Sequence, residues 1–133
     1  FAGCSLEDIC ASGTEELACL GITDTTPLDT TDGVFFISAD GDAGLDFLVE
    51  KDNSATTTED VATMADDTFI TTTWFIDPDA SKVFYSVNNA APVGVAITNL
   101  PDDEELTVSF GIQNGEASAQ TMTIDYVVAA VER

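Results

Sequence analysis

A two-residue alternation of apolar and polar side chains recurs along this sequence and constrains its fold more than any other feature. It is plain in residues 106–112, whose apolar members are Leu106, Val108, Phe110 and Ile112. Because successive side chains of a β-strand point to opposite faces, this period is typical of a strand with one buried face. Residues 58–64 come nearest to a helix, but Val61 and Met64 make only a thin apolar face. The sequence therefore predicts an all-β fold.

The predicted strands are short and are separated by turn-forming residues. Residues 69–76 have the strongest strand propensity, because all of them are β-branched or aromatic. Residues 17–22 are apolar on both faces, which indicates a strand in the middle of a sheet. Residues 25–32 and 53–60 are polar and are predicted to be loops. About ten such strands in a chain of 133 residues predict a single antiparallel β-sandwich domain over residues 1–133.

The charge balance excludes several classes of partner. The chain has 3 Lys and Arg residues against 25 Asp and Glu residues, which gives a formal net charge of −22. Phosphate groups are bound by Lys and Arg, so we expect no nucleic acid and no anionic membrane surface as a partner. Hydrophobic residues make up 44% of the chain, which separates it from acidic disordered tails.

The sequence shows neither a membrane span nor a targeting segment. No apolar run reaches about 18 residues, the length that a membrane-spanning helix needs, so we expect no membrane span. The first residue is Phe1 rather than Met, and no basic segment precedes an apolar stretch, so no signal peptide is recognisable. We expect that the start of the chain was processed or lies outside this sequence.

Histidine is absent, which removes the commonest general base and the commonest metal ligand. The three cysteines, Cys4, Cys10 and Cys19, form an odd set without a repeated spacing, so at least one thiol is unpaired. We expect them to be reduced and half-buried, in a protein made in a cytosol. Zinc binding would need further ligands of the kind that His supplies, and a Cys nucleophile would lack a base.

One acidic segment, residues 40–46, alternates Asp with Gly in the way that Ca²⁺-binding loops do. Asp40, Asp42 and Asp46 could place carboxylate oxygens around one hard cation. The EF-hand pattern fails, because Leu45 stands where that pattern has Gly. We expect a hairpin turn built on Asp and Gly, and no bound metal or other cofactor.

The other acidic groups form no recognisable catalytic pair. A glycosidase needs two carboxylates across a cleft. Residues 102–105 are instead four adjacent acids on a predicted turn, and we expect them to face water. The sequence therefore predicts that the chain is not an enzyme.

Four aromatic side chains on the predicted strands could form a platform for a sugar ring. They are Trp74, Phe75, Phe84 and Tyr85. Because large rings on a strand usually fill the core, core packing is the first expectation and a lectin-like surface is the alternative. Loss of glycan binding on Trp74→Ala would favour the alternative.

A series of strand and turn motifs occurs in order at residues 31–36, 45–52, 61–69, 82–88, 100–113 and 122–127. This order resembles the concanavalin-like jelly-roll domains of virion proteins from tailed phages and prophages. The ending, with Ile124, Asp125, Tyr126 and Val127 in the final strand, is also similar to that of laminin-G-like sandwiches. The motifs are patterns of strands and turns and include no catalytic signature.

The resemblance implies an antiparallel jelly-roll sandwich with a structural role in a virion. Domains of this kind carry one or more strands before the segment that corresponds to residues 5–9, so the N-terminal strands are expected outside this sequence or from a neighbouring copy. The implied protein is a capsid decoration or cement subunit, made in the cytoplasm of a bacterial host and placed on the outer capsid surface. Its implied partners are the major capsid protein and further copies of itself, with a trimer favoured.

Two other functions stay open at this point. The main alternative is a carbohydrate-binding, laminin-G-like lectin module on a tail fibre or a secreted protein. A glycoside hydrolase or lyase of the same sandwich class comes third, because the chain lacks His and a recognisable acid–base pair.

Overall fold

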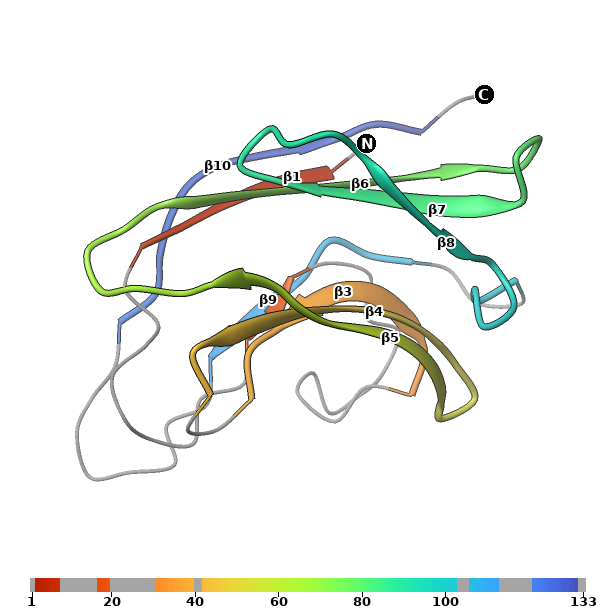
Figure 1. The fold of residues 1–133 in the computed structure, drawn as a ribbon, viewed down its shortest axis with the longest axis horizontal. Helices are drawn as coiled ribbons and strands as arrows, with labels where there is room; N and C mark the ends of the chain where they lie inside the picture. Colours follow the sequence, from red (N-terminus) through yellow and green to blue (C-terminus); the bar gives the residue numbers. More distant parts are fainter. Residues whose placement is uncertain are drawn as a thin grey trace.

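The computed structural model describes residues 2–7, 17–19, 31–39, 42–102, 106–112 and 121–131, which form two five-stranded sheets (Figure 1). Sheet A contains, in spatial order, β10 (Thr123–Ala129), β1 (Ala2–Glu7), β6 (Ile70–Asp77), β7 (Lys82–Val87) and β8 (Val93–Ala96). Sheet B contains, in spatial order, β5 (Ser54–Thr63), β4 (Gly44–Lys51), β3 (Gly33–Ile37), β2 (Leu17–Cys19) and β9 (Phe110–Ile112).

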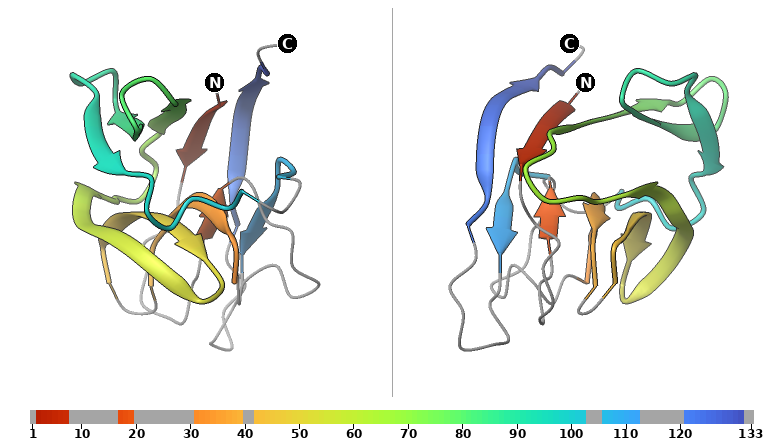
Figure 2. Two further views of the ribbon diagram at one scale, coloured as in Figure 1. Left: turned by 90° about the vertical axis from the view of Figure 1, so that its right-hand side faces the viewer. Right: turned by 60° about the vertical axis from the view of Figure 1, so that its left-hand side comes forward.

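The two sheets face each other as the two layers of the fold (Figures 1 and 2). Every strand pairing between the described residues is antiparallel. Strands β3, β4 and β5 follow one another across sheet B, and β6, β7 and β8 do the same across sheet A. The edge strands β10 and β9 lie on one side of the molecule, and β8 and β5 lie on the other (Figure 2). The prediction of an all-β antiparallel fold is therefore confirmed.

Two of the strand predictions agree closely with the structure, whereas of residues 106–112 only Phe110–Ile112 form a strand, β9. The β-branched and aromatic residues 69–76 correspond to β6. The segment predicted as a central strand contains β2, which lies between β3 and β9 in the interior of sheet B. Of the three cysteines, Cys4 lies on β1 and Cys19 on β2, whereas Cys10 lies outside the described residues.

The prediction of a polar loop over residues 53–60 is wrong. Residues 54–60 belong to β5, the longest described strand, which pairs with β4 from Ser54 to Thr63. The segment escaped recognition because its side chains are almost all polar and so show no apolar alternation. Threonine nevertheless fits a pleated strand well, because its branched side chain suits the extended backbone. A strand at the edge of sheet B needs no apolar face of its own beyond the residues that touch the core.

The core lies between the two sheets and is built from alternate residues of their central strands. Sheet B contributes Val34, Phe36, Leu45, Phe47 and Val49, and sheet A contributes Ile70, Val83, Tyr85 and Val87. Met64, just after β5, closes one end of this cluster. Because inward residues on β4 and β7 recur at every second position, the hydrophobic pattern sets the register of both hairpins.

Three aromatic rings join the two sheets at the centre of the core. The centroids of Phe36 and Phe47, on neighbouring strands of sheet B, are 4.9 Å apart. Tyr85 of sheet A approaches the Phe47 ring to 4.6 Å and meets the Phe36 ring edge-on at 6.3 Å. Such ring pairs stabilise a fold by about 0.5–1.5 kcal/mol beyond the area that they bury.

Truncation of a ring in this cluster should destabilise the whole sandwich. Phe36 is fully buried, so Phe36→Ala should lower the free energy of unfolding by about 3–5 kcal/mol through lost burial and the cavity that remains. Phe69→Ala is the matched control, because Phe69 is 44% exposed. Chemical denaturation of both variants measures the difference, and equal losses would contradict the assignment of Phe36 to the centre of the core.

The buried phenol of Tyr85 should make the fold sensitive to alkaline pH. Tyr85 is 8% exposed, and burial raises the pKa of its phenol above the ordinary value of 10.0. The unfolded chain therefore loses this proton first, so the stability that Tyr85 contributes is fully present below about pH 10 and falls as the pH rises further. Tyr85→Phe should flatten this part of the stability–pH profile, whereas the exposed-site control Tyr126→Phe should not. A stability–pH profile that Tyr85→Phe leaves unchanged would contradict the prediction.

Candidate functional site

The four aromatic residues of the predicted sugar platform divide between the two faces of sheet A. Tyr85 belongs to the core, and Trp74 packs against it. The indole Nε1 of Trp74 is buried and has no hydrogen-bond partner among the described residues. Trp74 therefore faces the interior, and Trp74→Ala would test packing rather than a surface platform.

Phe75 and Phe84 form the outward-facing part of the platform. They stand opposite each other on β6 and β7, and their inward neighbours along the strands are Trp74 and Tyr85. Their ring centroids are 5.1 Å apart, with 16° between the ring planes. The rings therefore stack on the outer face of sheet A, and each is half-buried.

Gly94 on β8 leaves the space that the Phe84 ring occupies on this face. The register pairs Gly94 with Phe84, and a Cβ atom on Gly94 would lie 2.8 Å from Cε1 of that ring. Because real Cβ contacts are never this short, only glycine lets the ring lie against the backbone of β8. The ring of Phe84 is thus held between Phe75 and the edge strand of sheet A.

A tight turn between β7 and β8 forms a wall beside these rings. Asn88 and Asn89 have φ angles of 51° and 60°, and the Ala90 N–H donates to the Val87 carbonyl at 3.0 Å. Positive φ at both central positions is the geometry of a type I′ turn, which Asn tolerates well. The Ser86 hydroxyl donates to the Ala90 carbonyl at 2.7 Å and holds the far side of the turn against β7.

The turn and the outer face of β6 and β7 enclose a surface pocket of about 250 Å³. Its lining residues are Thr73, Phe75, Ser86, Asn89, Ala90 and Pro92. They combine one aromatic ring, aliphatic surface, two hydroxyls and one amide, and none of them is charged. This composition is typical of a site for a neutral ligand with both apolar and hydroxylated surface. The sequence analysis identified Phe75 as a candidate for sugar binding. It did not predict that Thr73 and Asn89 lie beside it, because no sequence pattern relates these residues.

The acidic segment at residues 40–46 does not assemble as a cation site in the described part of the chain. Asp40 lies outside the described residues. The Asp42 carboxylate accepts the Gly44 N–H at 2.8 Å, and the Asp46 carboxylate accepts the Asp60 N–H at 2.8 Å. No group of three or more His, Cys, Asp or Glu side chains among the described residues is placed to hold a metal ion. Asp42 and Asp46 therefore act within the chain, one in a turn and one across β4 and β5.

Asp60 is an acidic neighbour of this segment that the sequence did not indicate. It lies on β5 at a bulge, where the pairing with β4 shifts between Leu45 and Phe47, and its φ is 54°. The bulge brings the Asp60 carboxylate over Gly44, where a Cβ atom would collide with it. Asp60 lies 14 positions after Asp46, so only the pairing of β4 with β5 reveals the approach.

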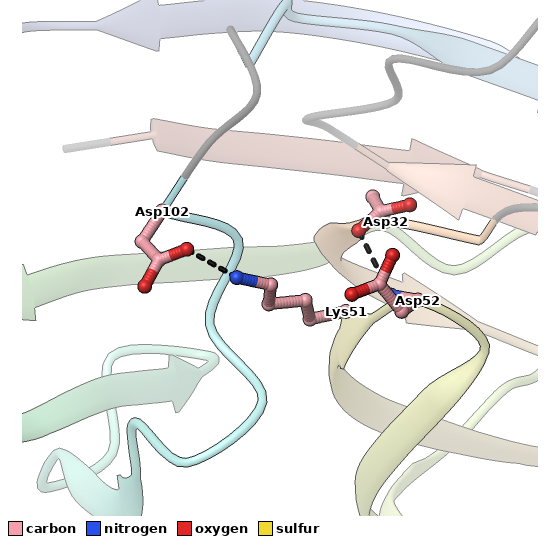
Figure 3. A network of polar contacts seen from close by, with 4 residues as sticks. All are labelled: Asp32, Lys51, Asp52 and Asp102. Carbon is pink, nitrogen blue, oxygen red and sulfur yellow. Dashed lines mark hydrogen bonds and ion pairs between the residues drawn. The ribbon is translucent and has the colours of Figure 1, made fainter.

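A second polar group joins the β4–β5 hairpin to the rest of the fold (Figure 3). The buried carboxylate of Asp32 accepts the Asp52 N–H at 2.9 Å and the Thr31 hydroxyl at 2.8 Å. Lys51, the residue before this turn, forms an ion pair with Asp102 in the segment after β8. The contacts hold the hairpin and this segment together, which assigns the group a structural role.

Comparison of the chain with protein-family models, with curated proteins and with solved structures gives no match. In the part of the chain that the structure describes, no helix has the length and hydrophobicity that crossing a bilayer requires. The surface itself therefore supplies the evidence for a function, and its two notable features are the pocket on sheet A and the edge strands.

Removal of the Asp32 carboxylate should destabilise the fold. Asp32→Ala leaves the N–H of Asp52 without its buried acceptor, so the free energy of unfolding should fall by about 1–3 kcal/mol. Asp102→Ala removes an exposed ion pair, for which the loss should stay below about 1 kcal/mol. Denaturant titration of the two variants distinguishes these values, and a larger loss for Asp102→Ala would contradict the ranking.

Proposed function

We propose that the chain is a structural subunit of a tailed-phage virion. In this proposal it is a jelly-roll sandwich that decorates or cements the capsid by binding the outer face of the major capsid protein. It acts through surface contacts rather than catalysis, and its copies associate in a small ring, with a trimer favoured. One observation carries the proposal: the long apolar edge strand β10.

The four sheet edges differ in how well they are protected from pairing with another chain. Strands β8 and β9 are only four and three residues long. Strand β5 is long, but its bulge and the exposed acids Glu59 and Asp60 disfavour a further strand. Strand β10 has seven residues, and beyond Asp125 it carries none of the charges or prolines that usually guard an edge.

The side chains of β10 are exposed as well as apolar. Tyr126 is 48% exposed and Val128 is 49% exposed, and Val127 between them is also exposed. Val131 extends the apolar surface beyond the end of the strand. An apolar surface of this kind on a strand edge is typical of a site that another protein covers. Figure 2 shows that β10 borders sheet A on the side opposite β8.

The charge of the chain suits the outside of a capsid. A net charge of −22 repels packaged DNA, whose phosphates require Lys and Arg for binding. Of the three basic residues, Lys51 is already paired with Asp102. A virion position on the outer surface keeps such a subunit away from the genome.

Copy number in purified virus particles tests the proposal. Quantitative mass spectrometry of particles from the source should find the protein at a ratio near that of the lattice positions of the major capsid protein. Absence from every particle would overturn the virion role.

A charge placed on the β10 edge should weaken attachment to the shell. Val128→Lys introduces a cation where the proposal has an apolar contact, so the amount that co-sediments with capsids lacking the subunit should fall about tenfold. Val108→Lys is the matched control, because Val108 is 47% exposed and lies outside the strands. Circular dichroism checks that both variants remain folded. Equal co-sedimentation of the two variants would remove β10 from the proposed contact.

A second candidate function is a carbohydrate-binding, laminin-G-like module on a tail fibre or a secreted protein. The outward-facing stack of Phe75 and Phe84 is the observation that favours it. A few copies per particle, rather than a number near the lattice count, would favour this candidate over the decoration subunit.

A further inference from the structure

We propose that the pocket beside Phe75 binds one neutral pyranose ring. This inference does not depend on the virion role, because a decoration subunit and a tail-fibre module could each carry such a pocket. It assigns a ligand class to residues of β6, β7 and the turn that follows β7. Four properties of the pocket carry it: its aromatic face, its polar groups, its rigid wall and its lack of charge.

The aromatic face is supplied by a ring whose position is fixed. Phe75 lines the pocket, and Phe84 stacks against it at 5.1 Å from the opposite strand. Gly94 in turn allows Phe84 to lie close to the backbone of β8. A pyranose has an apolar face of C–H groups, which packs against an aromatic face and removes both surfaces from water. The ring of Phe75 is therefore held in place before a sugar arrives.

The polar groups of the pocket match the hydroxyls around such a sugar ring. Thr73 and Ser86 each carry a hydroxyl that can donate and accept, and the Asn89 side chain adds an amide donor and an amide acceptor. The Ser86 hydroxyl already donates to the Ala90 carbonyl, which leaves its oxygen to accept a hydrogen bond from a ligand. Sugar hydroxyls both donate and accept, so they can satisfy groups of each kind.

The wall formed by the β7–β8 turn is held at several points. Asn88 donates its N–H to the Thr71 carbonyl at 2.7 Å and accepts the Thr71 N–H on its side-chain oxygen at 3.0 Å. The Ala90 N–H closes the turn on Val87. Because the wall is ordered before a ligand arrives, binding costs little additional conformational entropy.

Charge and size restrict the class of sugar. No lining residue is charged, so the pocket offers no cation to a carboxylate or sulfate. The net charge of −22 further disfavours an anionic sugar through long-range repulsion. A volume of about 250 Å³ lies below the range of roughly 300–1,000 Å³ that is common for drug-sized ligands. The pocket therefore fits a single neutral ring rather than an enclosed oligosaccharide.

Titration of the ¹⁵N-labelled protein with simple glycosides tests the inference. The probes are the methyl glycosides of glucose, galactose, mannose and N-acetylglucosamine, with methyl glucuronide as the anionic comparison. At least one neutral glycoside should shift the amide resonances of Thr73, Ser86 and Asn89 in a saturable manner. Methyl glucuronide should bind more weakly. No shift at these residues with any neutral glycoside, or equal binding of the glucuronide, would overturn the inference.

Variants of the pocket connect any binding to the proposed residues. Phe75→Ala should raise the dissociation constant of the bound glycoside about tenfold, because the apolar face is lost. Phe69→Ala removes an exposed ring outside the pocket and should leave the constant unchanged. Asn89→Asp keeps the shape of the side chain and tolerates positive φ, so it should weaken binding without disturbing the turn.

The result is also separable from the copy-number experiment. Glycoside binding by a protein that is absent from particles would leave the pocket assignment intact and remove the virion role. Unchanged binding by both Phe75→Ala and Asn89→Asp, with the fold confirmed by circular dichroism, would place the sugar elsewhere and contradict the inference.

Discussion

The contact of three rings between the sheets is the constraint on which the rest of this structure depends. Phe36 and Phe47 come from sheet B and Tyr85 from sheet A, so the cluster fixes how the two layers meet. It also sets the register of their strands, because a slip by one residue would turn every inward side chain to the outside. Both hairpins, β3–β4 and β6–β7, therefore keep the pairing that the core requires.

The outer face of sheet A follows from this inner packing. Once Tyr85 points inward, Phe84 and Ser86 must point outward, and the pairing of β6 with β7 places Phe75 opposite Phe84. The turn at Asn88 and Asn89 then folds against that face and completes the pocket. The half-buried ring of Phe75 is held in place on this face, because it stacks on Phe84 and Gly94 leaves room for the Phe84 ring.

The strand edges and the charge together bear on the proposed contact with other subunits. The acids of β5 and its bulge discourage pairing on one side, whereas β10 leaves an apolar edge on the other. Self-repulsion from a net charge of −22 opposes indiscriminate aggregation, so a contact at β10 must be specific enough to overcome it. This combination is compatible with the proposed subunit, which would have to remain dispersed until it binds the shell.

The sequence alone determined the all-β character, because alternation and β-branched runs are local properties that need no knowledge of distant residues. It also determined the charge, and with it the expectation that phosphate-bearing molecules are not partners. It could not assign the faces of residues 69–76 and 83–87, since apolar residues occupy both parities there and only packing against sheet B turns Trp74 inward and Phe75 outward. The strand at residues 54–63, the approach of Asp60 to Gly44 and the pocket likewise arose only in the tertiary structure, because each depends on pairing or packing between segments that local patterns do not relate.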